Sequence, residues 1–221
     1  MLELNDFPIA LAWHIVQDDD KSNHKLAIGT LKGNLLLYHY SEKSDSNHDE
    51  MISFTQNIPI KILGKHTGKI QCGQWNPSSN HLILGSSDCT CTISNMEGDT
   101  LAHLNLNNEP LEICSPPKDV IEDNSNTIVA VILCEDKLLL LIEDIDPVEI
   151  SFEDENDKIV SFDFISNDSI IVGLESGFLK LLSISIDGTY NIMWTKKAYE
   201  GILEEMVYSR SLKKCAIIGK S

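Results

Sequence analysis

Short apolar runs separated by turn residues recur along the whole chain, and this repetition constrains the fold more than any other feature. The clearest unit has an apolar run at residues 69–75, a turn at 76–79, a second run that ends at Gly85, another turn, and a third run at 90–95. Short apolar runs bounded by Gly, Asn, Asp, Ser and Pro are typical of strands. No window of a dozen residues has sustained helical periodicity, so the sequence predicts an all-β fold.

The glycines that end the second run of each unit measure the period of the repeat. Gly29 and Gly85 are 56 residues apart, and Gly173 and Gly219 are 46 apart. The 88 residues between Gly85 and Gly173 make two units of 44. Four-stranded units that repeat every ~40–45 residues are typical of the blades of a WD40-type β-propeller. We attribute the longer first interval to a polar insertion loop at residues 41–57.

The repeat divides the whole chain, residues 1–221, into about four and a half antiparallel four-stranded blades. Closed propellers hold ~4–8 blades, and this chain stops in the middle of a sheet. We therefore expect an incomplete propeller, either a fragment of a longer protein or an open arc that needs a partner. The predicted blades lie at approximately 7–63, 64–108, 109–153, 154–200 and, as a partial blade, 201–221.

The charge balance excludes nucleic acid and anionic lipid as partners. The chain has 17 basic and 34 acidic residues, a formal net charge of −17, and a single arginine, Arg210. Binding to a phosphate backbone depends on clustered Lys and Arg, whereas these lysines are scattered. An acidic surface favours basic patches on protein partners instead.

The sequence has the features of a soluble intracellular protein. No stretch approaches the 18 or so uncharged residues that a membrane helix needs, and acids stand at Glu3 and Asp6, where a secretory signal carries positive charge. Six cysteines without a framework spacing suit a reducing compartment. We expect no direct insertion into a membrane.

Two polar residues are candidates for a structural network within a blade. His66 follows Gly64 and Lys65 ahead of the second blade, and Asp88 lies in the turn after its second strand. In WD repeats such a His and Asp commonly share hydrogen bonds that hold the blade together, because buried polar groups are paired. The third strand should then end in Trp-Asp but reads Ser94-Asn95, so we expect a partial network.

Aromatic residues recur at the ends of the first strands, which predicts core packing and no ligand role. These repeat-core residues are Trp13, Trp75, Phe164 and Tyr208.

The sequence predicts no catalytic, cofactor or metal site, and the binding surface stays unassigned. Cys89 and Cys91 lack the further Cys or His ligands of a zinc site, and the Gly-Lys-Ser that ends the chain lacks the first glycine of a phosphate-binding loop. A propeller hydrolase is an open alternative that needs acids on first strands, where the chain offers Glu112 and Asp163.

Four segments carry a more specific resemblance, strongest over residues 26–100. Residues 94–100, Ser-Asn-Met-Glu-Gly-Asp-Thr, are the discriminating segment, because generic WD repeats read Trp-Asp there. Together the four resemble the family of WD repeat-containing protein nineteen, a subunit of intraflagellar transport complex A. The segments are residues 26–38, 64–67, 70–76 and 94–100.

The resemblance implies a non-enzymatic scaffold with no cofactor. Proteins of this family are similar to coat subunits, with N-terminal propellers followed by a helical solenoid, and serve retrograde ciliary transport and import of membrane receptors. It implies other complex A subunits and ciliary cargo proteins as partners, in the cytoplasm, the cilium and the ciliary base. A WD40 subunit of another coat or trafficking complex, or a ubiquitin-ligase adaptor, is the alternative within the same class.

Overall fold

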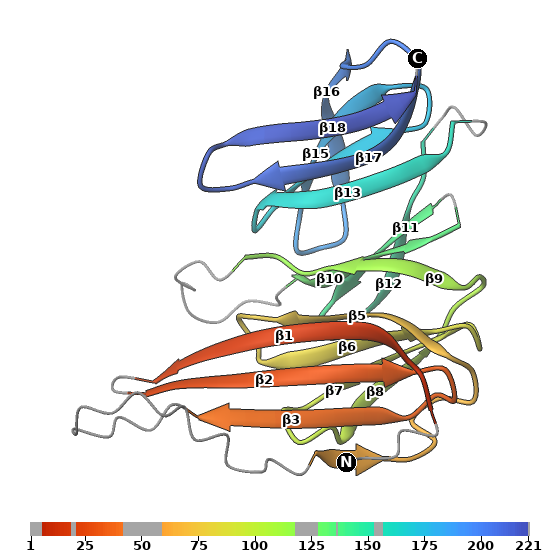
Figure 1. Ribbon diagram of the computed structural model, residues 1–221. Coiled ribbons are helices and arrows are strands. Elements are labelled where there is room, and N and C mark those ends of the chain that lie inside the picture. The colour runs from red at the N-terminus through yellow and green to blue at the C-terminus, as the bar shows by residue number, and fades with distance from the viewer. Residues whose placement is uncertain are drawn as a thin grey trace. The chain divides into compact units, whose positions relative to one another are not determined.

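The computed structural model describes residues 6–18, 21–41, 59–117, 128–135, 137–152 and 157–220. The chain forms two compact units, residues 1–110 and 111–221. Within the described ranges it consists of strands and turns without a helix (Figure 1). The polar insertion predicted at 41–57 lies outside these ranges, apart from residue 41.

The first unit contains two four-stranded antiparallel sheets, each with its strands in sequence order. The first sheet consists of β1 (Pro8–Asp18), β2 (Lys21–Thr30), β3 (Leu35–Ser41) and β4 (Ile60–Ile62). The second consists of β5 (Ile70–Asn76), β6 (His81–Ser86), β7 (Thr90–Ser94) and β8 (Thr100–Asn105).

The second unit contains two more four-stranded sheets and a hairpin, again antiparallel and in sequence order. The first sheet consists of β9 (Pro110–Cys114), β10 (Ile128–Cys134), β11 (Lys137–Ile142) and β12 (Ile145–Ile150). The next consists of β13 (Ile159–Ser166), β14 (Ser169–Leu174), β15 (Phe178–Ile184) and β16 (Tyr190–Lys197). The hairpin is β17 (Ile202–Ser209) with β18 (Lys214–Lys220). Four full sheets and a half sheet confirm the predicted all-β fold of about four and a half blades.

The strands alternate between two faces, and in the first unit one face of each sheet joins a shared core. In β1, Ala10 and Ala12 are buried while Leu11 and Trp13 between and after them are exposed, as the two-residue period of a strand requires. Trp75 from β5 fills the centre of this core, and its indole N–H donates to the Ala12 carbonyl at 3.2 Å. The core joins the two sheets through Ala10, Ala12, Ala27, Leu35, Leu37, Ile70, Trp75, Leu82 and Leu84.

The recurring second-strand glycine marks the place where one sheet touches the next within a unit. A Cβ on Gly29 would lie 2.3 Å from Ile70 Cγ2, at the start of β5. A Cβ on Gly173 would lie 3.2 Å from Leu203 Cδ2 of β17. Glycine allows this close approach because it has no side chain. At these two glycines the sequence repeat therefore marks a contact between consecutive sheets.

A second glycine closes the turn between the second and third strands. Gly33 has φ +73° and Gly177 has φ +87°, a backbone conformation that costs other residues about 1–2 kcal/mol. The Gly33 carbonyl accepts the His66 N–H at 3.0 Å, and a Cβ on Gly33 would lie 2.1 Å from the His66 carbonyl oxygen. In the second sheet Cys89 takes this turn position with φ +59°.

A pair of alanine substitutions separates the effect of backbone conformation from that of close approach. Gly33→Ala should lower the free energy of unfolding of the first unit by clearly more than the roughly 1 kcal/mol expected from φ alone. Gly64→Ala is the matched control, because Gly64 has φ +63° with nothing within 4 Å of its Cβ position. Urea denaturation followed by tryptophan fluorescence measures both. Equal losses for the two variants would show that the contact with His66 contributes nothing.

Candidate functional site

The turn between β6 and β7 brings together the two residues of the predicted blade network. His66 is 4% exposed, and its Nδ1 lies 3.6 Å from Asp88 Oδ1. Thr90 connects them: its Oγ1 is 2.9 Å from His66 Nδ1 and 2.5 Å from Asp88 Oδ1. Thr92 Oγ1 lies 3.0 Å from His66 Nε2 on the other side of the ring.

The donors and acceptors of this network follow from its geometry. Thr90 has one hydroxyl proton, and it donates that proton to the Asp88 carboxylate, which can only accept. Thr90 Oγ1 therefore accepts from His66 Nδ1–H, and the unprotonated Nε2 accepts from Thr92. Both imidazole nitrogens are thus paired, although Ser94-Asn95 replaces Trp-Asp.

Asp88 also ties this turn to the segment before β5. Its Oδ2 accepts from the Thr67 N–H at 2.8 Å, the Thr67 hydroxyl at 3.0 Å and the Gly68 N–H at 3.3 Å. Burial opposes the charged carboxylate, but hydrogen bonds from Thr90, Thr67 and Ser86 hold its pKa well below the usual range. Burial lowers the pKa of His66, and the charge of Asp88 offsets this only in part.

Two other sheets use a carboxylate in the same place, which the sequence reasoning missed. Asp6, before β1, accepts from the Lys32 N–H at 3.1 Å and the Asn34 amide at 2.7 Å. Asp157, before β13, accepts from the Ser176 N–H at 2.9 Å and from the Ser176 hydroxyl. In all three sheets an acid links the turn after the second strand to the segment before the first strand. The acid precedes the first strand in two of the sheets but lies in the turn itself in the third. No fixed sequence spacing therefore identifies it.

The predicted repeat-core aromatics do not share one environment. Trp75 is 2% exposed and Phe164 is fully buried. Trp13 is 55% exposed, which corrects the expectation that it packs in a core. Its side chain lies on the face of β1 opposite to Ala12, away from the shared core, and its ring is 5.6 Å from that of His24.

Tyr208 is partly buried, and it lies one residue beyond the strand position that the other three aromatic residues occupy. Trp75 and Phe164 pair with the residue three positions before the second-strand glycine. Each of the four first strands has a bulge near the partner of the glycine. In β17 the equivalent position is taken by Val207, and Tyr208, one residue further along, pairs with Cys215. Tyr208 instead packs at the edge of the cluster formed by β13–β16 and the hairpin.

The acids named for a hydrolase, Glu112 and Asp163, lie in the second unit and interact. Burial, with the negative charges of Asp163 and Glu205, raises the pKa of Glu112 to about 7. Asp163 is already engaged: Arg210 Nη2 lies 3.5 Å from its Oδ1 and the Tyr208 N–H 3.4 Å from its Oδ2. Asp163 Oδ1 also accepts from the Cys114 thiol, with Sγ at 3.6 Å. This arrangement joins β9, β13 and β17 and fits a structural role.

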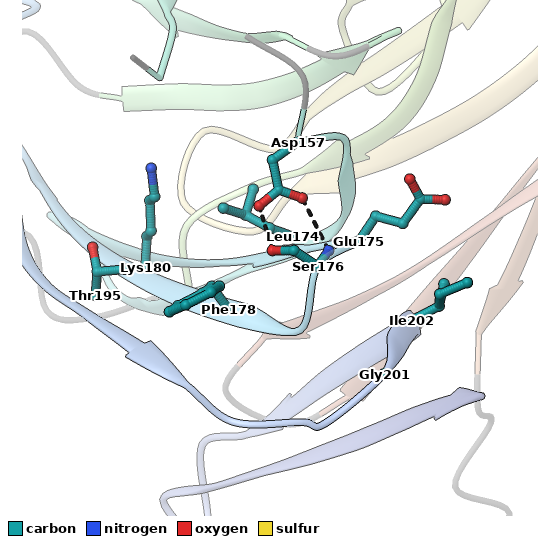
Figure 2. Close-up of a pocket in the computed structure, with 9 residues that line it drawn as sticks. All are labelled: Asp157, Leu174, Glu175, Ser176, Phe178, Lys180, Thr195, Gly201 and Ile202. Atoms are coloured by element: carbon teal, nitrogen blue, oxygen red, sulfur yellow. Dashed lines mark hydrogen bonds between the residues drawn. The ribbon is translucent and has the colours of Figure 1, made fainter. Parts of the chain in front are cut away.

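An open pocket of about 650 Å³ lies in the second unit, beside the turn between β14 and β15. Figure 2 shows Asp157 at its centre, bound to Ser176, with Lys180 and Thr195 on one side and Glu175 and Ile202 on the other. Its size is within the range of ligand pockets, ~300–1,000 Å³. Leu174 and Phe178 supply its apolar wall.

Two further features concern only the described part of the chain. No group of three or more His, Cys, Asp or Glu side chains is placed to hold a metal ion there. Cys91 is fully buried and Cys89 occupies its strained turn.

No helix long and apolar enough to cross a bilayer occurs in the described ranges either.

Asp88→Asn should destabilise the first unit, because the variant removes the charged acceptor of the network. We expect a loss of about 1–3 kcal/mol at pH 7 by urea denaturation. Since the pKa values of Asp88 and His66 are lowered in the folded state, their contributions are present at neutral pH. They are lost as the pH falls below about 6.5 for His66 and then below about 3.8 for Asp88. Asp187→Asn is the control: this exposed carboxylate accepts only from Thr189 within its own turn, and an amide oxygen can accept the same bonds, so we expect a much smaller loss.

Glu112→Gln should stabilise the second unit at alkaline pH. The folded-state pKa of about 7 exceeds the ordinary value of 4.5, so protonation contributes stability below pH 4.5 that is lost as the pH rises through 7. A neutral amide avoids that loss, and we expect a gain of about 1–2 kcal/mol at pH 8, discounted for partial exposure. Urea denaturation at pH 5 should show little gain. A gain of equal size at both pH values would contradict this account.

Comparison with known proteins gives one consistent match. Residues 11–221 match the family described as the WDR19 first beta-propeller. WD repeat-containing protein 19 of Mus musculus is 34% identical over 200 residues, and that of Homo sapiens is 30% identical over 198, each covering 88% of this chain. WD repeat-containing protein dyf-2 of Caenorhabditis elegans is 23% identical over 97% of the chain. The chain spans 14% of the length of each relative.

A solved structure supports the fold. The β-propeller domain of Cps50 (Swd1) from Myceliophteria thermophila aligns with a TM-score of 0.61 at 13% identity, covering 97% of this chain and 64% of that one. With repeated four-stranded sheets, a propeller neighbour and a family match over nearly its full length, the chain belongs to the family of the first β-propeller of WD repeat-containing protein 19.

Proposed function

We propose that this chain is part of a non-enzymatic protein-interaction scaffold, a subunit of intraflagellar transport complex A. The observation that carries the proposal is the match of residues 11–221 to the first propeller of WD repeat-containing protein 19. In this role the protein acts in retrograde ciliary transport and in the trafficking of receptors to the cilium. Its partners are other complex A subunits and ciliary cargo proteins, in the cytoplasm, the cilium and the ciliary base.

The use of polar groups in the described residues supports a scaffold over an enzyme. His66 and Asp88 bind each other through Thr90, and Asp163 is occupied by Arg210 and two further donors. A general acid or base needs a side chain free to reach a substrate proton. These groups instead hold turns and strands in place.

The surface supports binding to other proteins. The exposed face of β1 carries Leu11 at 66% and Trp13 at 55% exposure, and adjacent exposed apolar residues favour protein contacts. The formal charge of −17 favours partners with basic patches and makes association depend on ionic strength.

Affinity purification tests the proposal in the full-length protein that contains this chain. Tagged protein expressed in ciliated cells should recover complex A subunits and concentrate in cilia and at their base. Deletion of residues 11–221 should reduce that recovery or the ciliary signal, while a tagged unrelated propeller serves as the control. Recovery of another coat complex or of ubiquitin-ligase subunits, without complex A subunits, would overturn the proposal in favour of those alternatives.

A further inference from the structure

Two lysines are buried in the described residues, and only one of them has an oxygen partner. Lys25 is 8% exposed; its ammonium donates to the Met96 carbonyl at 3.0 Å and lies 3.9 Å from a Glu97 oxygen. Lys180 is 7% exposed, and its one interaction within the described ranges is with the Phe152 ring, 4.4 Å from Nζ. The side chain of Lys180 is therefore buried along most of its length, while its Nζ reaches solvent and has no oxygen partner among the described residues. The Nζ of Lys25, by contrast, is held by a carbonyl oxygen.

Lys180 lines the pocket of Figure 2 together with groups that suit a ligand. Lys180 pairs across the strands with Thr195, and Phe178 pairs with Lys197. Because paired residues and alternate residues share a face, these four side chains lie on one face of the sheet. Lys197 Nζ is 5.0 Å from the centre of the Phe178 ring and donates to the Ser176 carbonyl at 2.7 Å. The pocket thus has a cationic, partly aromatic side in an otherwise acidic chain.

The other side of the pocket limits the charge of an occupant. Asp157 and Glu175 also line it; in Figure 2 Glu175 lies on the side opposite to Lys180, with Asp157 between them. The two carboxylates repel a doubly charged phosphate more strongly than they repel a ligand with a single negative charge. Phosphate sites also favour the paired donors of arginine, and the only arginine, Arg210, binds Asp163. One carboxylate, with an apolar neighbour against Leu174, Phe178 and the exposed Ile202, fits best.

We propose that this pocket binds a partner protein through a Glu or Asp side chain placed on Lys180, with an adjacent apolar side chain against the Phe178 wall. The proposal rests on the function of the chain as an interaction scaffold and names one of its contact sites. The carboxylate accepts from the Lys180 ammonium in place of solvent, and the hydroxyl of Thr195, the cross-strand neighbour of Lys180, is placed to donate beside it. The chain as a whole repels acidic segments, and Lys197 on the same face already donates to the Ser176 carbonyl, so recognition depends on Lys180.

Peptide titration of the 221-residue chain tests the site. The probes are two capped peptides, Gly-Ser-Leu-Glu-Leu-Ser-Gly and the same sequence with Gln in place of Glu, titrated by calorimetry or NMR. We expect the Glu peptide to bind at least fivefold more tightly than the Gln peptide. Lys180→Met should remove that preference, whereas Lys196→Met, which deletes a charge near Trp194 on the opposite face, should retain it.

The variants also report on the fold and on rival ligands. Lys180→Met should not lower the melting temperature, because Met keeps the buried apolar part of the side chain and no hydrogen bond of the described residues is lost. If it does, Thr195→Val is the second variant and should weaken binding of the Glu peptide alone. Equal binding of the two peptides, or inorganic phosphate that competes more tightly than the Glu peptide, would overturn the proposal. Loss of the peptide preference while the full-length protein still recovers complex A subunits would reject this site and leave the proposed function intact.

Discussion

Close contact between successive sheets at a glycine is the constraint on which each unit depends. A four-stranded sheet with apolar side chains on its face is stable only when another sheet covers that face. Gly29 lets Ile70 of β5 reach the first sheet, and Gly173 does the same for Leu203 of β17. Large residues then fill the space between the sheets, as Trp75 does in the first unit. Packing at this density makes even small additions of volume costly.

Carboxylates at the turns complement this apolar contact. Asp6, Asp88 and Asp157 each accept backbone N–H groups that the strand ladders leave unpaired, and unpaired buried donors are expensive. The apolar contact sets the distance between sheets, whereas these bonds set the position of each turn relative to its first strand. The pocket around Lys180 lies beside one such turn, so Ser176 and Asp157 hold its rim in place.

The repeat, the strand ranges and the family could be predicted from the sequence, because a period of glycines and turn residues reflects backbone geometry directly. Side-chain environments could not, because they depend on what covers each face. Trp13 and Trp75 occupy equivalent positions in the sequence repeat, yet only Trp75 is buried. Val207, and not Tyr208, takes the equivalent position in β17. Thr90 and Thr92 alternate on β7 and could have been noticed beside His66, whereas the place of Lys180 in the wall of a pocket is visible only in three dimensions.

The junction at Arg210 has a consequence for how this chain tolerates substitution. Its Nε donates to the Phe164 carbonyl at 3.1 Å while Nη2 lies 3.5 Å from Asp163 Oδ1, so one planar group contacts two acceptors on β13. A lysine carries the same charge, but its single nitrogen has no fork to span both oxygens. All other basic residues of the chain are lysines. At position 210, however, a change from arginine to lysine would lose one of these two contacts.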